Sequence, residues 1–254
     1  MEQPKTSFKQ LWPSDELSDY VELYWEHKNL LSSPKKMTIA PDSFFKIILY
    51  IKDDQIVDYF LTGLWTKEKE IVIPAKTTVY GIKFKLLSPE FILNREIASL
   101  LNESAPLETI YLNADQLDFS SLESTTLHFE KELTKRLQKN QSVASKKLQL
   151  SQLLDKVGGD ITVENVGNQI NWSSRQINRY LNKYLGISLK KYLNIQKCYA
   201  SYVQIINGNL FPEKGFYDQA HFIREIKKHT SETPKNLNKE MDDRFIQLKH
   251  IRRE

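Results

Sequence analysis

The spacing of apolar residues changes partway along the chain, and this change limits the folds open to it. Between Phe44 and Leu86 apolar residues recur at alternate positions, as in strands with one buried face. After Lys146 they recur every three or four positions, as in amphipathic helices. We therefore predict an α+β protein, in which a small β-barrel or sandwich precedes an all-α domain.

The length of 254 residues corresponds to roughly two domains. A helical pattern begins near Ser120, with Leu122, Phe129, Leu133 and Leu137 on one face. We expect a β-rich domain over residues 1–119, a linker helix over 120–145 and a helical domain over 146–254.

The first β-hairpin is predicted from the most apolar stretch of the chain. Phe44 to Ile51 is rich in β-branched and aromatic residues, and its alternate positions are all apolar. Asp53 and Asp54 follow as a turn signal, and the segment from Ile56 to Leu61 returns as the partner strand. Turn chemistry explains the two adjacent carboxylates better than acid–base catalysis does.

Two further strands and a helix start are expected in the same half. A strand over 71–73 ends at Pro74, and another covers 78–86. Gly81 within the second strand indicates a bulge or a close backbone approach. Ser88 and Pro89 are typical of a helix N-terminus, with Ser88 as the N-cap and Pro89 at the first helical position.

The chain lacks the residue patterns of most catalytic and metal sites. Its single cysteine, Cys198, excludes a disulfide framework and a zinc site built on several thiolates. His27 and His128 form no pair at helical spacing, and no nucleophile, phosphate-loop or dinucleotide motif is present. We expect no enzyme activity, no metal and no cofactor. An N-terminal barrel enzyme with a helical appendage is the minor alternative, and the apolar interior is either a ligand cavity or a filled core.

No segment approaches the roughly 18 apolar residues that span a bilayer. The N-terminal ten residues also lack the apolar region of a secretory signal. A soluble, cytoplasmic protein is expected, without a membrane partner.

The net charge of +4 conceals an asymmetry between the two halves. Residues 1–145 hold 17 Lys and Arg against 21 Asp and Glu, whereas residues 146–254 hold 19 against 11. The second half is therefore basic by 8 charges, as a nucleic-acid-binding domain would be. A solvated basic surface without a partner is the alternative.

The first helical segment of interest has the plan of a helix-turn-helix. Thr162 is positioned to cap a short helix, and Asn171-Trp172-Ser173 interrupts the apolar spacing before a second helix that stops at Gly186. Gly167 is expected to leave room for a neighbouring helix. Ile177 and Leu181 would anchor the second helix, so that polar residues point outward. Among these outward residues, the predicted DNA contacts are Ser174, Arg175, Asn178 and Arg179 at the bases and Lys183 at a phosphate.

A second amphipathic segment follows a long helix that begins after Ser188. Asp218 is a good N-cap, and Phe222 and Ile226 form the inward stripe. The outward positions suit DNA, although packing explains His221 equally well. The predicted contacts are Gln219, His221 and Arg224 at the bases and Lys227 and Lys228 at phosphates.

Together these segments resemble the AraC/XylS family of bacterial transcription regulators. The most specific part is the block GFYDQAHFIREIKKHTSETPKNL, residues 215–237. PDSFF from Pro41 and YGIKFK from Tyr80 are similar to the sensor domains that precede such modules. The resemblance implies two helix-turn-helix units bridged by a long helix, double-stranded DNA as partner, and an N-terminal domain that senses a small-molecule effector or dimerises.

The chain departs from the family pattern between Ala200 and Gly215. This stretch is about five residues short and contains Phe211-Pro212. Because proline disfavours a helix interior, the first helix of the second unit is expected to be shortened or replaced by a loop. A helical protein-interaction module that has lost specific DNA binding is therefore the alternative function.

Overall fold

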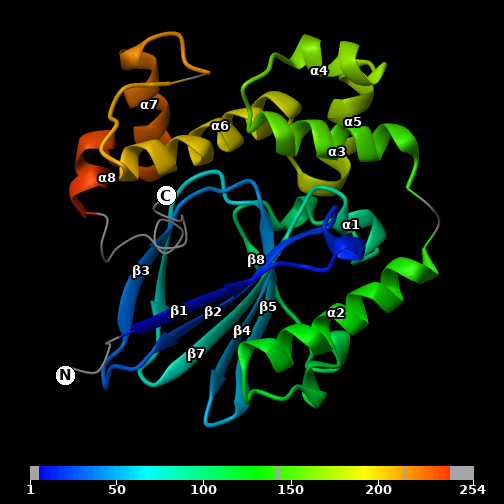
Figure 1. The fold of residues 1–254 in the computed structure, drawn as a ribbon, viewed down its shortest axis with the longest axis vertical. Helices are drawn as coiled ribbons and strands as arrows, with labels where there is room; N and C mark the ends of the chain where they lie inside the picture. The colour runs from blue at the N-terminus through cyan, green and yellow to red at the C-terminus, as the bar shows by residue number, and fades with distance from the viewer. Residues whose placement is uncertain (1–5, 141–142, 214, 241–254) are drawn as a thin grey trace.

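The computed structural model describes residues 6–140, 143–213 and 215–240. A β-rich part is covered at one end by a layer of helices (Figure 1). The predicted order of a β-rich half followed by a helical half is confirmed.

The β-rich part contains two antiparallel sheets. Six strands form the larger sheet and two the smaller one. In spatial order, the larger sheet is β1 (Thr6–Leu11), β2 (Val21–Asn29), β7 (Thr77–Phe84), β4 (Phe45–Lys52), β5 (Gln55–Thr62) and β8 (Ser104–Pro106), and the smaller sheet pairs β3 (Lys35–Ile39) with β6 (Lys69–Ile73). The strands expected near 44–51, 56–61, 71–73 and 78–86 are all present.

The β4–β5 hairpin turns at the two adjacent aspartates. Asp53 and Asp54 both have positive φ, at 50° and 55°, between the facing residues Lys52 and Gln55. Two positive φ angles give a two-residue hairpin the twist that its strands need. The turn interpretation of these carboxylates is confirmed.

Gly81 is a close-approach position, as one of its two sequence interpretations requires. A methyl group at Gly81 would overlap the indole ring of Trp25 on the adjacent strand β2. The glycine therefore lets the Trp25 ring lie flat against strand β7.

Both faces of strand β7 are buried. Tyr80 stacks on Phe129 of α2 (Leu122–Lys139) with ring centroids 5.6 Å apart, and its hydroxyl lies 3.0 Å from Thr126 Oγ1. Ser121 caps α2, which begins close to Ser120, where the helical pattern starts, and α2 lies on the larger sheet. On the other face of β7, Val79 and Lys83 are also buried.

Four short helical segments lie between strands or between the last strand and α2. They are η1 (Asp15–Leu17), α1 (Ser88–Phe91), η2 (Ala98–Leu100) and η3 (Tyr111–Gln116). The expected cap of α1 is wrong: the N-cap is Leu87, and Ser88 is already helical. The Ser88 hydroxyl instead donates to the Tyr20 carbonyl, so a tertiary contact has taken the group that the local pattern assigned to capping.

The helical part contains six helices in the described residues. They are α3 (Ser145–Val157), α4 (Val163–Ile170), α5 (Ser174–Leu185), α6 (Leu189–Ile206), α7 (Gln219–Thr230) and α8 (Pro234–Glu240). The predicted helix ends at Gly158 and Gly186 are confirmed, with φ of 54° and 75°. Buried residues of α3, α4, α5 and the first half of α6 belong to the same core as the larger sheet.

Candidate nucleic-acid interface

The helices α4 and α5 form a helix-turn-helix whose turn is fixed by local contacts. Thr162 Oγ1 accepts from the Asn165 N–H at 3.2 Å, and Asn171, with a φ of 49°, is the C-cap that follows α4. Gly167 was expected to admit a neighbouring helix, but its neighbour is the turn: a methyl group there would lie 2.9 Å from the Trp172 carbonyl oxygen. The chain can therefore fold back tightly against α4.

A capping box starts α5. Ser173 Oγ accepts from the Gln176 N–H at 3.3 Å, and Gln176 Oε1 accepts from the Ser173 N–H at 3.1 Å. Two N–H groups of the first turn are thereby satisfied within the chain. The start of α5 is therefore fixed by contacts within four consecutive residues.

The two faces of α5 differ sharply in burial. Ile177, Tyr180, Leu181 and Leu185 are buried in the core. Arg175 and Arg179 are exposed, and because they are four residues apart they lie on the same side of the helix. The structure thus presents two guanidinium groups to solvent from a helix whose opposite side is held firmly.

Ser174 and Asn178 are half-buried, unlike the two arginines. Asn178 Nδ2 donates to the Ser174 carbonyl at 2.8 Å, and Asn178 Oδ1 accepts from the Leu189 N–H at 2.9 Å. The asparagine therefore joins α5 to the first turn of α6. No local sequence signal indicated this role, because Leu189 is eleven residues away.

The C-terminal end of α5 rests on the β-rich part of the molecule. The Ile97 N–H donates to the Tyr184 carbonyl at 2.9 Å, and Lys183 Nζ lies 3.7 Å from Glu96 Oε1. A methyl group at Gly186 would lie 2.8 Å from the Ala98 carbonyl oxygen. The predicted phosphate contact Lys183 therefore has a carboxylate neighbour from the N-terminal half.

The second candidate recognition helix, α7, also has a capped N-terminus. Asp218 Oδ1 accepts from the His221 N–H at 2.7 Å, and Phe222 and Ile226 are buried. Most of the predicted contacts on this helix are exposed to solvent, namely Gln219, Arg224, Lys227 and Lys228. Lys228 Nζ lies 3.8 Å from Glu225 Oε1, which is a weak surface pair.

His221 is half-buried at the start of α7. Its Nδ1 accepts from the Tyr217 N–H at 3.3 Å, and its ring meets the Phe216 ring edge to face. These contacts fit the packing interpretation of His221 raised by the sequence.

The first helix of the second unit is absent from the described residues between α6 and α7. A loop without helix runs from 207 to 213 and from 215 to 218, tied by a 2.7 Å bond from Gln204 Nε2 to the Phe211 carbonyl. The expected replacement by a loop is confirmed. The expected double helix-turn-helix is therefore corrected to one complete unit and a single further helix, because Pro212 and the short spacing leave no room for a scaffold helix.

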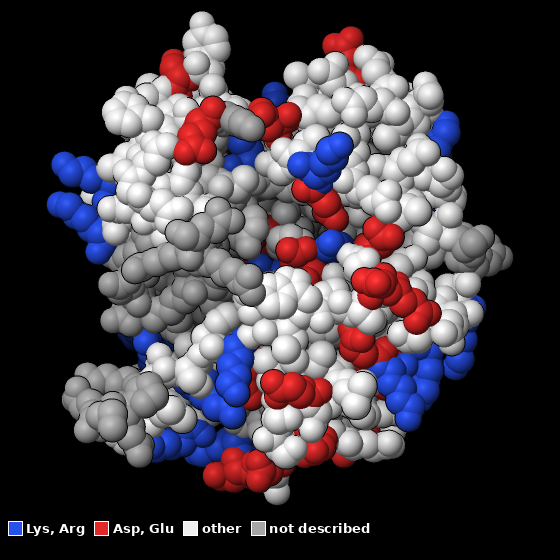
Figure 2. Space-filling model, viewed as in Figure 1, with Lys and Arg blue, Asp and Glu red and all other residues white. Residues whose placement is uncertain are grey.

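Exposed basic side chains continue beyond α7. Lys235 and Lys239 on α8 are exposed like Lys227 and Lys228 on α7. Figure 2 shows Lys and Arg side chains projecting at the edge of the molecule where α7 and α8 lie. Such a surface suits the phosphate backbone of a nucleic acid.

Metal binding, nucleophilic catalysis and membrane insertion find little support in the described part of the chain. It holds no group of three or more His, Cys, Asp or Glu that could bind a metal ion. Burial raises the pKa of the Cys198 thiol to about 12, so this thiol is a poor nucleophile. Among the helices that the structure describes, none combines the length and the apolar character needed to cross a membrane.

Comparisons with known proteins give one family match and several similar structures. The family model of a domain of unknown function, DUF6597, matches residues 9–106, which run from β1 to β8. A search of curated proteins finds no match.

Several solved structures of ToxT from Vibrio cholerae are similar to this chain. ToxT of strain O395 is 14% identical, with 93% of this chain and 97% of that chain covered and a TM-score of 0.42. The P21 crystal form of ToxT is 13% identical, with coverages of 92% and 97% and a TM-score of 0.42. An apo ToxT variant of strain SCE256 is 10% identical, with coverages of 93% and 97% and a TM-score of 0.44. With identities this low, the function must be argued from the geometry of the chain itself.

Proposed function

We propose that this protein is a sequence-specific DNA-binding transcription regulator that reads the major groove with α5. The observation that carries the proposal is the division of α5 into a buried face and an exposed face with Arg175 and Arg179. This helix is the second of a helix-turn-helix, the position from which such motifs enter the groove. The resemblance of residues 146–237 to the AraC/XylS family supports the same function.

In this proposal the two arginines of α5 make the first base contacts. An Arg guanidinium can donate two hydrogen bonds to guanine O6 and N7. Ser174 lies in the first turn of the same helix and would contact a base or a phosphate there. Asn178 would contact adenine only by giving up its hydrogen bonds to Ser174 and Leu189. Its first role is therefore to hold α5 against α6.

The helix α7 supplies a second and weaker set of contacts. Gln219 and Arg224 are exposed and would reach bases, and His221 would join them only by leaving its contact with the Tyr217 N–H. Lys227 and Lys228 would bind phosphates, as would Lys183 once it separates from Glu96. Phosphate contacts position the protein without specifying sequence, and they make binding dependent on salt.

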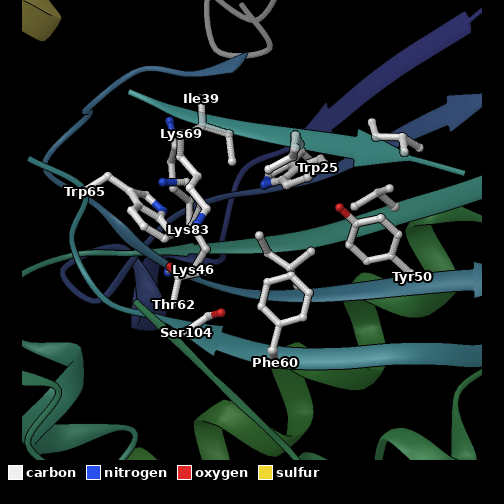
Figure 3. A pocket seen from close by; sticks show the side chains of 14 residues that line it. Trp25, Ile39, Lys46, Tyr50, Phe60, Thr62, Trp65, Lys69, Lys83 and Ser104 are labelled. Carbon is white, nitrogen blue, oxygen red and sulfur yellow. The ribbon is translucent and has the colours of Figure 1, made fainter. Parts of the chain in front are cut away.

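The β-rich part is proposed to sense a small molecule. It contains a cavity of about 130 Å³ between its two sheets, lined mainly by apolar and aromatic side chains (Figure 3). Apolar cavities with a few polar groups are the usual sites for small ligands. Homodimerisation stays a prediction, as do the operator sequence and the direction of regulation.

Selection from a pool of random duplex DNA tests the proposal. The wild-type protein should enrich a defined sequence, and a variant with Arg175→Ala and Arg179→Ala should enrich none. Lys52→Ala changes an exposed lysine at the end of β4 and serves as the matched control, which should select the wild-type sequence. Equal affinity of the wild-type protein for every duplex would refute the proposal.

A protein-interaction module is the second candidate, and the loop between α6 and α7 favours it. Without a scaffold helix in the described residues of that connection, α7 is not presented as in a complete helix-turn-helix. Titration of random duplex DNA at low salt separates the two functions. Absence of binding even at low salt would favour the interaction module, since nonspecific phosphate contacts are strongest there.

A further inference from the structure

One aromatic side chain lies almost completely in solvent at the start of α7. Tyr217 is 94% exposed, and the next most exposed large apolar residue in the described part of the chain, Leu127, is 73% exposed. Tyr217 immediately precedes Asp218, the N-cap of α7. Burial of an aromatic ring is favourable, so a ring presented in this way is available to a partner.

The residues before Tyr217 are held against α6. The Phe216 ring meets the Phe222 ring of α7 edge to face, with centroids 5.0 Å apart, and Lys197 Nζ of α6 lies 5.6 Å from the centre of the Phe216 ring. At Gly215, φ is 76°, and a methyl group there would lie 2.9 Å from carbons of the Lys197 side chain. Phe216 is therefore packed inward, and the next side chain points outward.

The residues after Tyr217 fix its backbone from the other side. Asp218 Oδ1 accepts from the His221 N–H at 2.7 Å, and the Tyr217 N–H donates to His221 Nδ1 at 3.3 Å. These bonds tie Tyr217 to the first turn of α7. Because its backbone is held and its side chain has two torsions, Tyr217 loses little conformational entropy when its ring makes a contact.

The exposed side of α7 beyond this ring is polar and basic. Its exposed residues include Gln219, Arg224, Lys227 and Lys228. Docking sites for proteins are contiguous apolar patches, whereas a basic surface suits the phosphates of a nucleic acid. The surroundings of Tyr217 therefore favour DNA as the partner of its ring.

The helix α7 is placed to reach the same duplex as the helix-turn-helix of α4 and α5. Figure 1 shows α4 and α7 on the same side of α6, the side that faces away from the two sheets. With 18 residues, α6 is about 27 Å long, which is comparable with the roughly 34 Å of one DNA turn. One duplex can therefore contact both ends of this face.

We propose that Tyr217 determines specificity at one position of the DNA site, where its ring packs on the methyl group of a thymine in the major groove. The thymine methyl is the one apolar group that base edges present there, so it is the feature that an exposed ring can recognise. In helix-turn-helix proteins the N-terminal residues of the reading helix contact base edges, and Tyr217 lies at that end of α7. The inference rests on the proposed function.

Deoxyuridine scanning of the selected duplex tests the proposal. Deoxyuridine lacks only the methyl group of thymine and keeps its hydrogen-bonding edge. Replacement of one particular thymine should weaken binding of the full-length wild-type protein about fourfold, as the loss of one buried methyl group does. Fluorescence anisotropy measures the affinities. A wild-type protein that tolerates deoxyuridine at every thymine would overturn the proposal.

Substitution of the tyrosine assigns this thymine dependence to its ring. Tyr217→Ala should bind the unmodified duplex about fourfold more weakly and should no longer distinguish thymine from deoxyuridine at that position. Tyr217→Phe keeps the ring and should retain the distinction. Leu127→Ala truncates an exposed apolar residue of α2 and is the matched control, which should behave as the wild type.

Two results with Tyr217→Ala would contradict the assignment. The first is full thymine dependence at every position, which would place another residue on the methyl group. The second is an equal loss of affinity for random duplex DNA, because that pattern belongs to a phosphate contact.

Failure of this inference can be told apart from failure of the proposed function. Selection of a defined sequence by the wild-type protein, without thymine dependence through Tyr217, would overturn only the contact. Selection of no sequence would overturn the proposed function, and the contact with it.

Discussion

The two candidate reader helices start in similar ways but are mounted differently. Both have a side-chain cap, Ser173 for α5 and Asp218 for α7. The buried face of α5 belongs to a core that is continuous with the larger sheet, and its C-terminal end contacts Ile97. Phe222 and Ile226 of α7 belong to a separate small cluster, which they share with residues of α6 and α8 and with Ala40 of the β-rich part. Local sequence thus sets where a helix begins, whereas distant contacts decide how firmly it is held.

The largest effect is expected from Phe222→Ala in the separate cluster. Phe222 is fully buried, and truncation of a buried phenylalanine costs about 3–5 kcal/mol of stability. Because α7 and α8 depend on this small cluster, we expect them to open locally while α5 stays folded. Hydrogen exchange measures this as loss of amide protection in α7 and α8 alone. Equal loss in α5 would show that both readers belong to one cooperative unit.

Leu181→Ala applies the matching change to the other reader. Leu181 is fully buried, and the expected cost is about 2–5 kcal/mol. Because its core is shared with the larger sheet, the loss should appear in the unfolding of the whole molecule. Urea unfolding should show a lower midpoint with an unchanged slope when followed by tryptophan fluorescence. A separate early transition confined to α5 would contradict the shared core.

The way in which α5 and α7 are held in the fold could be predicted from the sequence only in part. The strands near 44–51 and 78–86 and the caps at Thr162, Ser188 and Asp218 follow from residue patterns within a few positions. The loop before α7 was also predictable, because Pro212 and the short spacing act locally. Such features depend on backbone preferences that the neighbouring residues determine.

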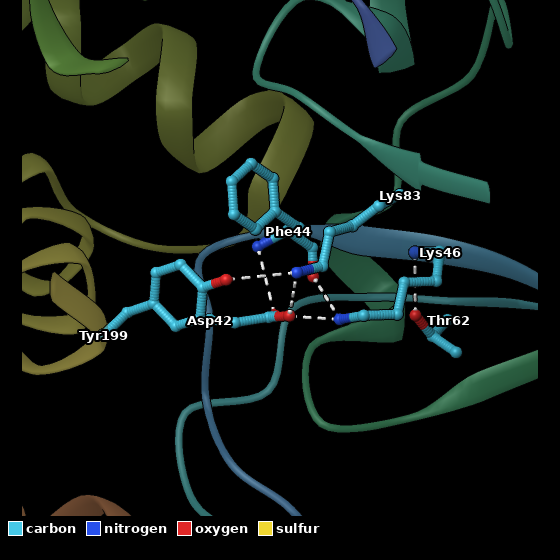
Figure 4. A network of polar contacts seen from close by, with 6 residues as sticks. All are labelled: Asp42, Phe44, Lys46, Thr62, Lys83 and Tyr199. Atoms are coloured by element: carbon cyan, nitrogen blue, oxygen red, sulfur yellow. Dashed lines mark hydrogen bonds and ion pairs between the residues drawn. The ribbon is translucent and has the colours of Figure 1, made fainter. Parts of the chain in front are cut away.

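Long-range features escaped the sequence analysis for a physical reason. The burial of Lys83 depends on Asp42 and on Tyr199 of α6, residues that no local pattern connects (Figure 4). The Asn178 brace and the contact of Gly186 with Ala98 likewise join distant segments. A sequence pattern that assumes polar residues to face outward therefore placed Asn178 among the base contacts. The same assumption did not predict that Lys46 and Lys83 are buried. The base contacts themselves stay predictions.

The arginines of the two helices should differ in their effect on DNA binding. Arg179→Ala should weaken binding to the selected sequence by about 1–3 kcal/mol and relax the preference at one base pair. Arg224→Ala should cost less than about 1 kcal/mol, because α7 is the less firmly mounted helix. Fluorescence anisotropy with the selected duplex and with single-base variants measures both.

The control for this pair is nonspecific DNA. Both variants should lose little affinity for random duplex, and the loss should be similar for the two. A uniform loss across all duplexes for Arg179→Ala would reduce its role to a phosphate contact. A larger loss of specific binding for Arg224→Ala than for Arg179→Ala would reverse the ranking of the two helices.

The smallest effect is expected from pH, and it should act on α7 alone. Burial lowers the pKa of His229 in α7 below its ordinary value of about 6.5, whereas α5 contains no histidine. Because the folded state favours the neutral ring, its contribution to stability is complete above the unfolded pKa and is lost as the pH falls below it. Lowering the pH from 7 to below the ordinary histidine pKa should therefore decrease the amide protection of α7 more than that of α5. His229→Gln should remove this dependence, and His221→Gln, at the half-buried histidine of the same helix, should retain it. An equal decrease in α5 would assign the pH response to the shared core instead of the small cluster.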